Sequence, residues 1–288
     1  MGLSTGEILS AFGIAGYSAQ VPTLRRFFSK PQDAMTKYDH LGLATRNGLD
    51  AATLAKAGFT GDRTILEGPQ AFWRLSGAEG CDWNYMTDGL GERWVTDDTR
   101  PKAFPVGVGS VTMLEALKDL IAQHGLKLGD VRHVTVRTTQ SYVQKTLDVQ
   151  TEIEAWTDLR YCVAAMFAGI EPYKDWYLPK NFLRPDIKAF MAKVSVEQLP
   201  RAREDGSARG VWAAAVEVRT DKGSVRAGRD VLTPMSDAAL DAKFRDNISG
   251  ELPARSADRL IRLCHGLENV ASVREIGAAL RRPGPPAG

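Results

Sequence analysis

The chain has 288 residues, enough to bury a sizeable core in one large domain or two modest ones. Its formal net charge is +2, and its lysines and arginines are scattered, so the pattern does not favour nucleic-acid binding. Three widely separated cysteines, Cys81, Cys162 and Cys264, fit neither a disulfide framework nor a metal cluster. No apolar run approaches the roughly 20 residues of a membrane span, and no signal peptide is recognisable. We therefore expect a soluble, cytoplasmic protein.

The first predicted element is a helix over residues 5–17, with Thr5 as its N-cap. Its small residues, among them Gly13 and Gly16, would let another helix approach closely. A helix this rich in small and apolar residues needs cover on more than one side. No earlier segment of the sequence supplies that cover.

Residues 35–68 contain a second helical run, from about Gly48 to Ala55. Its predicted buried stripe consists of Leu49, Ala52, Leu54 and Ala55. Gly58 is expected to end the helix, since glycine adopts a left-handed conformation without strain. Lys37 and His40 lie three residues apart and could share one helical face near a ligand.

The pattern of predicted elements changes at Pro101, from an irregular connection to regular helices and strands. Helices are predicted over 110–124, with Ser110 as N-cap and Gly125 at the end, over 158–168 and over 185–191. Alternating residues predict strands over 131–138 and 193–198, and a hairpin of 211–219 with 224–231 around an Asp-Lys-Gly turn. Three helices follow, beginning near residues 235, 256 and 273. The pattern indicates an α+β unit with an antiparallel sheet, inserted into a helical domain.

Candidate catalytic residues are few, because nucleotide-binding, P-loop, HExxH and CxxC motifs are all missing from the sequence. His124, His133 and His265 are interpreted as structural or surface residues. For His40, a ligand-facing role and a structural role both stay open. Lys102 precedes Phe104-Pro105 at the change of pattern, where clefts form, although a surface lysine is the simpler reading. Tyr161 heads an apolar helix, where a buried hydroxyl usually finds a partner.

Taken together, these stretches resemble the MmgE/PrpD family in order along nearly the whole chain. The segments that carry the resemblance are 11–16 (AFGIAG), Met35-Thr36-Lys37 with His40, Gly42, Ala44, Asn47 and Gly48, 58–61 (GFTG), 65–68 (ILEG), Lys102 with Phe104-Pro105, 160–165 (RYCVAA), and 234–236 (PMS) with Lys243-Phe244.

The resemblance implies a helical domain, residues 1–100 and 232–288, carrying an inserted α+β lid, residues 101–231. It implies a lyase or isomerase that needs neither metal nor cofactor and acts on small polycarboxylates by dehydration, decarboxylation or epimerisation. Lys37, Lys102 and Tyr161 match catalytic positions of the family. We assign His40 and Arg46 to substrate binding. Lysines would clamp the anionic substrate, and the tyrosine hydroxyl would donate a proton.

Two departures from the family qualify these expectations. The family's catalytic histidine after Phe-Pro has no counterpart, because residues 106–109 read Val-Gly-Val-Gly. The chain also begins where family members are already well into their helical domain, so it corresponds to the C-terminal part of the family's full length. We therefore expect a hetero-oligomer, in which a separate chain supplies the N-terminal half and completes the active site. A non-catalytic binding or regulatory subunit is the alternative.

Overall fold

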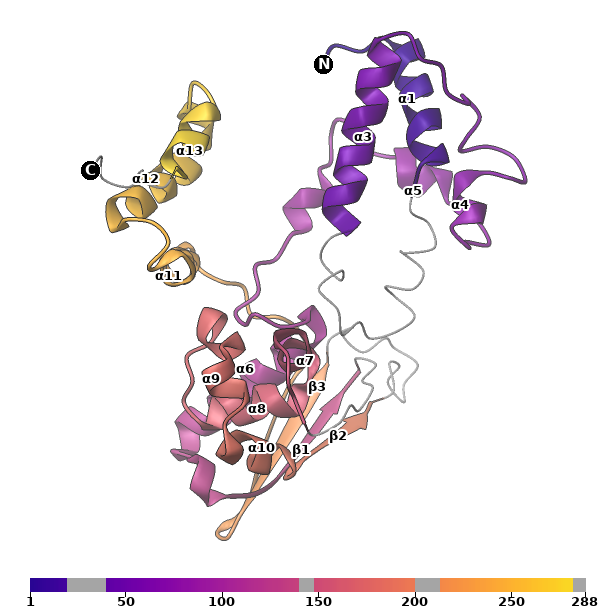
Figure 1. Ribbon diagram of the computed structural model, residues 1–288. Helices are drawn as coiled ribbons and strands as arrows, with labels where there is room; N and C mark the ends of the chain where they lie inside the picture. Colours follow the sequence, from indigo (N-terminus) through magenta and orange to yellow (C-terminus); the bar gives the residue numbers. More distant parts are fainter. Residues whose placement is uncertain (20–39, 140–147, 200–212, 282–288) are drawn as a thin grey trace. The chain divides into compact units, whose positions relative to one another are not determined.

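The computed structural model describes residues 1–19, 40–139, 148–199 and 213–281 (Figure 1). The chain divides into two compact units, Met1–Asp98 (unit 1) and Thr99–Gly288 (unit 2). Helix and sheet are both present, as the α+β prediction requires. None of the helices in the described ranges has the length and apolar character of a membrane span.

Unit 1 is helical in its described part. Its elements are α1 (Thr5–Tyr17), α3 (His40–Lys56), α4 (Phe72–Leu75), α5 (Trp83–Thr87) and the 3-10 helix η2 (Val95–Asp98). The predicted N-cap of α1 was wrong by one residue. Ser4 is the cap, because its Oγ accepts a hydrogen bond from the backbone N–H of Glu7 at 3.4 Å. The Glu7 carboxylate in turn accepts one from the Ser4 N–H at 2.6 Å.

Small residues allow α1 to be approached very closely, as predicted, but by backbone from a loop in addition to helix α3. A Cβ added to Gly13 would lie 2.4 Å from the Asp62 nitrogen, and one on Gly61 would lie 2.2 Å from the Ser10 oxygen. Helix α3 is tied to α1 by Asn47, whose Nδ2 donates to the Ala15 carbonyl at 2.9 Å. The backbones of the AFGIAG and GFTG segments are therefore in direct contact, with no side chain between them at Gly13 and Gly61.

The predicted buried stripe of α3 was only partly right. Ala51 and Ala55 are buried, whereas Leu49 and Leu54 are 59% and 44% exposed. Alanines one turn apart leave room for α1 to approach, so the bulkier leucines lie outside this contact. Gly58 has a φ of +93°, which confirms its predicted place at the end of the helix.

Unit 2 begins with α6 (Val108–His124), and its sheet is formed by β1 (Val131–Thr138), β2 (Val194–Gln198), β3 (Ala214–Thr220) and β4 (Gly223–Arg229). Between β1 and β2 lie α7 (Glu152–Thr157), α8 (Leu159–Phe167), η4 (Tyr173–Tyr177), α9 (Pro179–Phe182) and α10 (Pro185–Met191). After the sheet come α11 (Asp237–Ile248), α12 (Ala254–His265), η5 (Leu267–Asn269) and α13 (Arg274–Ala279), and η3 (Leu128–Asp130) precedes β1.

The sheet has the order β2-β1-β3-β4 and is mixed, so the purely antiparallel prediction was wrong. β1 pairs parallel with β2, because the chain returns through α7–α10 and re-enters the sheet in the same direction. β3 and β4 form the predicted hairpin, closed by the pair Thr220 and Gly223. The predicted cap of α6 was also wrong. Gly107 precedes its first turn and Ser110 is buried inside the helix, whereas Gly125 ends the helix with φ +59°, as expected.

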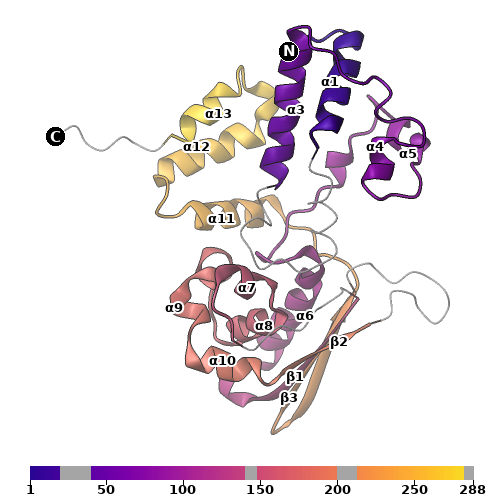
Figure 2. The same ribbon diagram turned by 45° about the vertical axis from the view of Figure 1, so that its right-hand side comes forward.

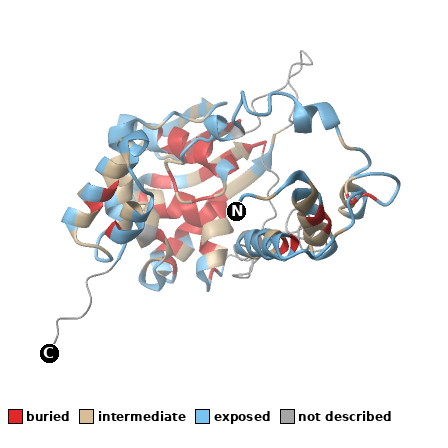
Figure 3. Cartoon of the chain, turned by 90° about the horizontal axis from the view of Figure 1, so that it is seen from above, coloured by how far each residue is buried: buried red, intermediate tan, exposed pale blue. Residues whose placement is uncertain are grey.

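Helices α6 and α8 cover one face of the sheet, as Figure 2 shows. Valines alternate toward them, with Val134 and Val136 on β1 and Val216 and Val218 on β3 all buried. In Figure 3 the buried residues gather in this sheet and its covering helices. Residues 104–218 thus supply one continuous apolar core.

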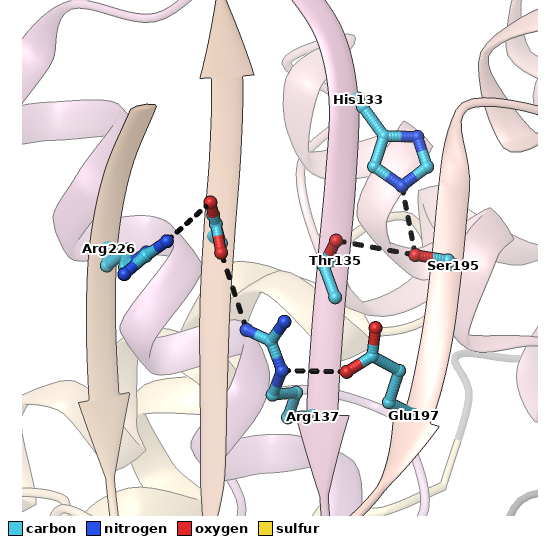
Figure 4. Close-up of polar contacts among 7 residues, drawn as sticks. His133, Thr135, Arg137, Ser195, Glu197 and Arg226 are labelled. Carbon is cyan, nitrogen blue, oxygen red and sulfur yellow. Dashed lines mark hydrogen bonds and ion pairs between the residues drawn. The ribbon is translucent and has the colours of Figure 1, made fainter. Parts of the chain in front are cut away.

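The other face of the sheet carries polar side chains that pair across the strands (Figure 4). Arg137 on β1 bonds Glu197 on β2 at 2.7 Å and Glu217 on β3 at 3.4 Å, and Arg226 on β4 bonds Glu217 at 2.9 Å. His133 Nε2 lies 3.0 Å from the Ser195 Oγ, so this histidine has the structural role predicted for it. Ion pairs between neighbouring strands thus connect all four strands of the sheet.

Candidate active site

Lys102 lies in the short segment that leads into α6. Its Nζ donates a hydrogen bond to the Val106 carbonyl at 2.6 Å, and the side chain is half-buried. Burial lowers the pKa of this ammonium, and the positive charge of Lys243 lowers it further. Within the described ranges, no carboxylate lies within ion-pair distance of the Lys102 ammonium. A half-buried cation without an acidic partner is suited to receive an anion.

Lys243 is the charged neighbour that sequence reasoning did not identify as a site residue. It lies on α11, and its Nζ donates to the backbone carbonyl of Lys102 at 2.6 Å. The same Nζ stands 5.6 Å from the centre of the Tyr173 ring. The sequence contained one signal for it, since Lys243-Phe244 is among the segments that carry the resemblance to the family. Nothing in that signal indicated which residue it would meet.

Tyr161 lies in the first turn of α8 and is fully buried. Its hydroxyl donates a hydrogen bond to the carbonyl of Trp176, the partner expected for a buried tyrosine. Burial raises the pKa of the hydroxyl, so it stays protonated at neutral pH. Tyr161 is therefore a hydrogen-bond donor in this structure, and its present acceptor is backbone.

The 3-10 helix η4 connects these two predicted catalytic residues. Its Trp176 accepts the Tyr161 hydrogen bond and stacks on Phe104, with ring centres 6.0 Å apart. Its Tyr177 donates from the hydroxyl to the Pro105 carbonyl. Both the Lys102 segment and the α8 tyrosine are thus fixed to one short element.

A cavity of about 740 Å³ adjoins this cluster. Phe104, Tyr173 and Lys243 line it near the Lys102 segment, and Glu115, Asp119 and Arg229 line it on the α6 side. Arg229 approaches Asp119 at 2.5 Å and Glu115 at 3.6 Å, so the arginine offsets one of the two negative charges on this side. Tyr173 has a φ of +81°, a left-handed conformation that is strained for a bulky residue and often marks a functional site.

The remaining predicted site residues are in unit 1. Lys37 lies outside the described residues. His40 is the first residue of α3, but its side chain lies outside what the structure describes. Arg46 is exposed on α3 and forms an ion pair with Asp50, at 3.4 Å, one turn further along. The assignment of these three residues to catalysis or substrate binding stays a prediction.

Residues 106–109, where the family resemblance implies a histidine, lead into α6. Val106 is buried, Gly107 is the N-cap, and Val108 and Gly109 are the first two residues of the helix. No side chain in this segment can accept or donate a proton. In the part of the chain that the structure describes, no group of three or more His, Cys, Asp or Glu residues has the arrangement of a metal site.

Comparisons with known proteins identify the family. Residues 104–269 match the MmgE/PrpD C-terminal domain, and residues 1–81 match the MmgE/PrpD N-terminal domain. Over 304 aligned positions, the chain is 24% identical to cis-aconitate decarboxylase of Homo sapiens, covering 99% of this chain and 60% of that protein. The chain thus spans about 60% of the length of this relative. The first match lies in unit 2 and the second in unit 1, and the chain belongs to the MmgE/PrpD family.

Proposed function

We propose that this chain is a subunit of an MmgE/PrpD-type lyase that acts on a small polycarboxylate, with its active site completed by a separate polypeptide. The observation that carries the proposal is the cluster around η4. There, Lys102 is half-buried and has no acidic partner in the described ranges. Neighbouring residues of η4 bond the Pro105 carbonyl, three residues after Lys102, and the protonated hydroxyl of Tyr161. The similarity to cis-aconitate decarboxylase supports the same reaction class.

The chemistry of such a substrate matches the cluster. When a bond breaks at the carbon next to a carboxylate, negative charge develops on that carboxylate. An ammonium such as that of Lys102 stabilises this charge more strongly in a partly buried site than in water. The Tyr161 hydroxyl has a raised pKa and suits a donor better than a base. To reach a substrate it would have to exchange its bond with the Trp176 carbonyl.

The reaction also requires a base, and this chain has none at the position where one is expected. Residues 106–109 are only valine and glycine, where the family resemblance implies a histidine. A second polypeptide that contributes a base would resolve this, and unit 1 offers surface for it. Ile8, Leu9 and Phe12 of α1 are exposed, Phe12 to 55%, as are Leu49 and Leu54 of α3. Exposed apolar groups of this kind are typical of interaction surfaces.

The test is to purify the chain alone and together with a separate polypeptide that carries MmgE/PrpD N-terminal domain sequence, and to assay a panel of polycarboxylates that includes cis-aconitate. We expect turnover only from the complex. Lys102→Met should reduce kcat by about 10²-fold or more, and Lys37→Ala should abolish turnover. Lys193→Met is the matched control, since Lys193 is also half-buried and donates to a backbone carbonyl, that of Val131, at 2.9 Å.

Two alternatives give different results. An epimerase of the same family would exchange substrate hydrogen with deuterated water and interconvert stereoisomers without releasing water or carbon dioxide. A non-catalytic binding or regulatory subunit, favoured by the missing lid histidine, would bind a polycarboxylate without turnover in any complex. A stable monomer that associates with no such polypeptide would contradict the composite-site proposal.

A further inference from the structure

The backbone of residues 102–106 is held through its carbonyl groups by side chains from different elements. Lys243 of α11 donates to the Lys102 carbonyl at 2.6 Å, and Tyr177 of η4 donates to the Pro105 carbonyl. Lys102 itself donates to the Val106 carbonyl at 2.6 Å, which folds its side chain back over the segment. The position of the Lys102 ammonium therefore depends on contacts made from outside the segment.

Lys243 is unusual among these contacts because it is charged and its partners are neutral. Its Nζ meets a backbone carbonyl and, at 5.6 Å, the face of the Tyr173 ring. Among the described residues, no carboxylate lies within ion-pair distance of this Nζ. A surface lysine seldom gives up both water and an acidic partner for a carbonyl, since a half-buried charge without a counter-ion is costly. The arrangement indicates a role for the charge.

We propose that Lys243 is a positioning residue for Lys102, which it serves by anchoring the Lys102 carbonyl and by placing a second positive charge beside the Lys102 ammonium. This inference rests on the active-site role of Lys102 given under the proposed function. Two neighbouring ammonium groups attract an anion together, and each makes the other easier to deprotonate. Lys243 would thus tune Lys102 both for substrate binding and for proton transfer.

The other ionisable groups near the pair are the phenol of Tyr173 and the charged side chains that line the adjoining cavity. Burial raises the pKa of Tyr173, and the negative charges of Asp246 and Glu171 raise it further, so the phenol is neutral and adds no negative charge. Burial also lowers the pKa of Lys243 itself. Elsewhere in the cavity lining, Arg229 pairs with Asp119 and Glu115 and offsets one of their two negative charges. The remaining charged groups that line the cavity are exposed, namely Lys118, Glu171 and Asp246.

The experiment measures the pKa of Lys102 directly, by NMR titration of lysine side chains in the full chain, with the Lys102 signal assigned from Lys102→Arg. In Lys243→Met, we expect the pKa of Lys102 to rise, because the neighbouring positive charge is removed while the burial of Lys102 remains. Lys243→Arg keeps the positive charge and should leave the pKa of Lys102 low. Lys193→Met is the matched control, because Lys193 likewise donates to a carbonyl, at 2.9 Å, and stands 5.6 Å from the centre of an aromatic ring, that of Phe190.

A pKa of Lys102 that is equal in the wild type, Lys243→Met and Lys193→Met would overturn the inference and leave the proposed lyase function intact. A rise confined to Lys243→Met supports the inference even where no substrate is turned over, so the two proposals fail separately. Where the completed enzyme is active, Lys243→Met should shift the alkaline limb of the pH profile of kcat upward, and Lys243→Arg should restore it. A general loss of fold would instead lower activity at every pH and would also be expected in Lys193→Met.

Discussion

The α/β body of unit 2 and the helical segments on either side of it in the sequence are stabilised differently. The body, residues 104–218, has one apolar core that includes Leu114, Leu117 and Trp176, all inaccessible to solvent. In the described part of unit 1, the buried hydrophobic residues are Ala51, Ala55, Ile65 and Ala71, and in helices α11–α13 they are Ala257, Leu260 and Ala279. The body is held by apolar burial, and the helical segments by close backbone approach, caps and polar contacts. A single substitution should therefore have different consequences in each.

The largest effect is expected in the body, from Asp158→Asn. Asp158 is buried, caps α8 by accepting from the Arg160 N–H at 2.9 Å, and pairs with the buried Arg160 guanidinium, with Nε at 3.0 Å. Removing its charge breaks the buried ion pair between Asp158 and Arg160, which should cost about 3–5 kcal/mol of unfolding free energy. Urea denaturation followed by circular dichroism measures this cost.

Asp186→Asn is the matched control, because Asp186 pairs with Arg184 through the same two guanidinium nitrogens, at 3.0 and 2.6 Å. Both side chains of that pair are exposed, so its loss should cost under about 1 kcal/mol. Equal losses of unfolding free energy in the two variants would mean that burial of the Asp158–Arg160 pair adds nothing to its contribution to stability.

The next effect tests unit 1 through Gly61→Ala. The new Cβ would lie 2.2 Å from the Ser10 oxygen, and this neighbour is backbone, so the loop must separate from α1. We expect a loss of about 1–3 kcal/mol, confined to unit 1, since overpacking at a close contact cannot be relieved by side-chain rotation. Hydrogen exchange should show α1 amides losing protection while the strands of unit 2 keep theirs.

Gly48→Ala is the control. Nothing lies within 4 Å of its Cβ, and alanine in the middle of α3 should stabilise the helix by up to about 1 kcal/mol.

A smaller effect separates structure from chemistry at Tyr161. Tyr161→Phe removes the hydrogen bond to the buried Trp176 carbonyl and should cost about 1–2 kcal/mol of unfolding free energy. If the hydroxyl also donates to substrate, kcat of the completed enzyme should fall far more than in Tyr177→Phe, which loses a similar bond to the Pro105 carbonyl. Unchanged kcat in both variants would restrict Tyr161 to a structural role.

The features predicted correctly from the sequence depend on neighbouring residues. The 220–223 hairpin turn, the glycines at 58 and 125 and the strand at 131–138 are local patterns, and the structure has them where expected. The direction of β2 is not local. Parallel pairing with β1 follows from the helices between the strands, which the sequence did indicate and which the antiparallel prediction did not use. The buried face of α3 was misjudged because contact with α1 favours alanine over leucine there.

The candidate site followed the same rule. The sequence indicated Lys102 and Tyr161 through the family resemblance, but it did not indicate that Trp176 of η4 would contact both Tyr161 and Phe104, a neighbour of Lys102. Lys243 meets Lys102 across 141 positions, and no periodicity or spacing reports such a contact. The division into a helical domain and an inserted lid stays a prediction, as do the roles of Lys37, His40 and Arg46.

The smallest predicted effect concerns the last helices, where polar contacts supplement a sparse core. His265 of α12 lies 2.9 Å from Asp241 of α11, and this hydrogen bond and the carboxylate charge raise the pKa of the histidine. A raised folded-state pKa means that the pair contributes its full stability below the unfolded value, about 6.5, and loses it as pH rises through the folded value. Asp241→Asn should therefore lower the urea midpoint at pH 6 and leave it nearly unchanged at pH 9.

Arg245→Gln is the control, since Arg245 joins the same two helices through Asp258, at 3.2 Å, and stays charged at both pH values. An equal change at pH 6 and pH 9 in Asp241→Asn would show that the carboxylate acts on α12 without His265, and the two helices would then resemble the pH-independent core of the body.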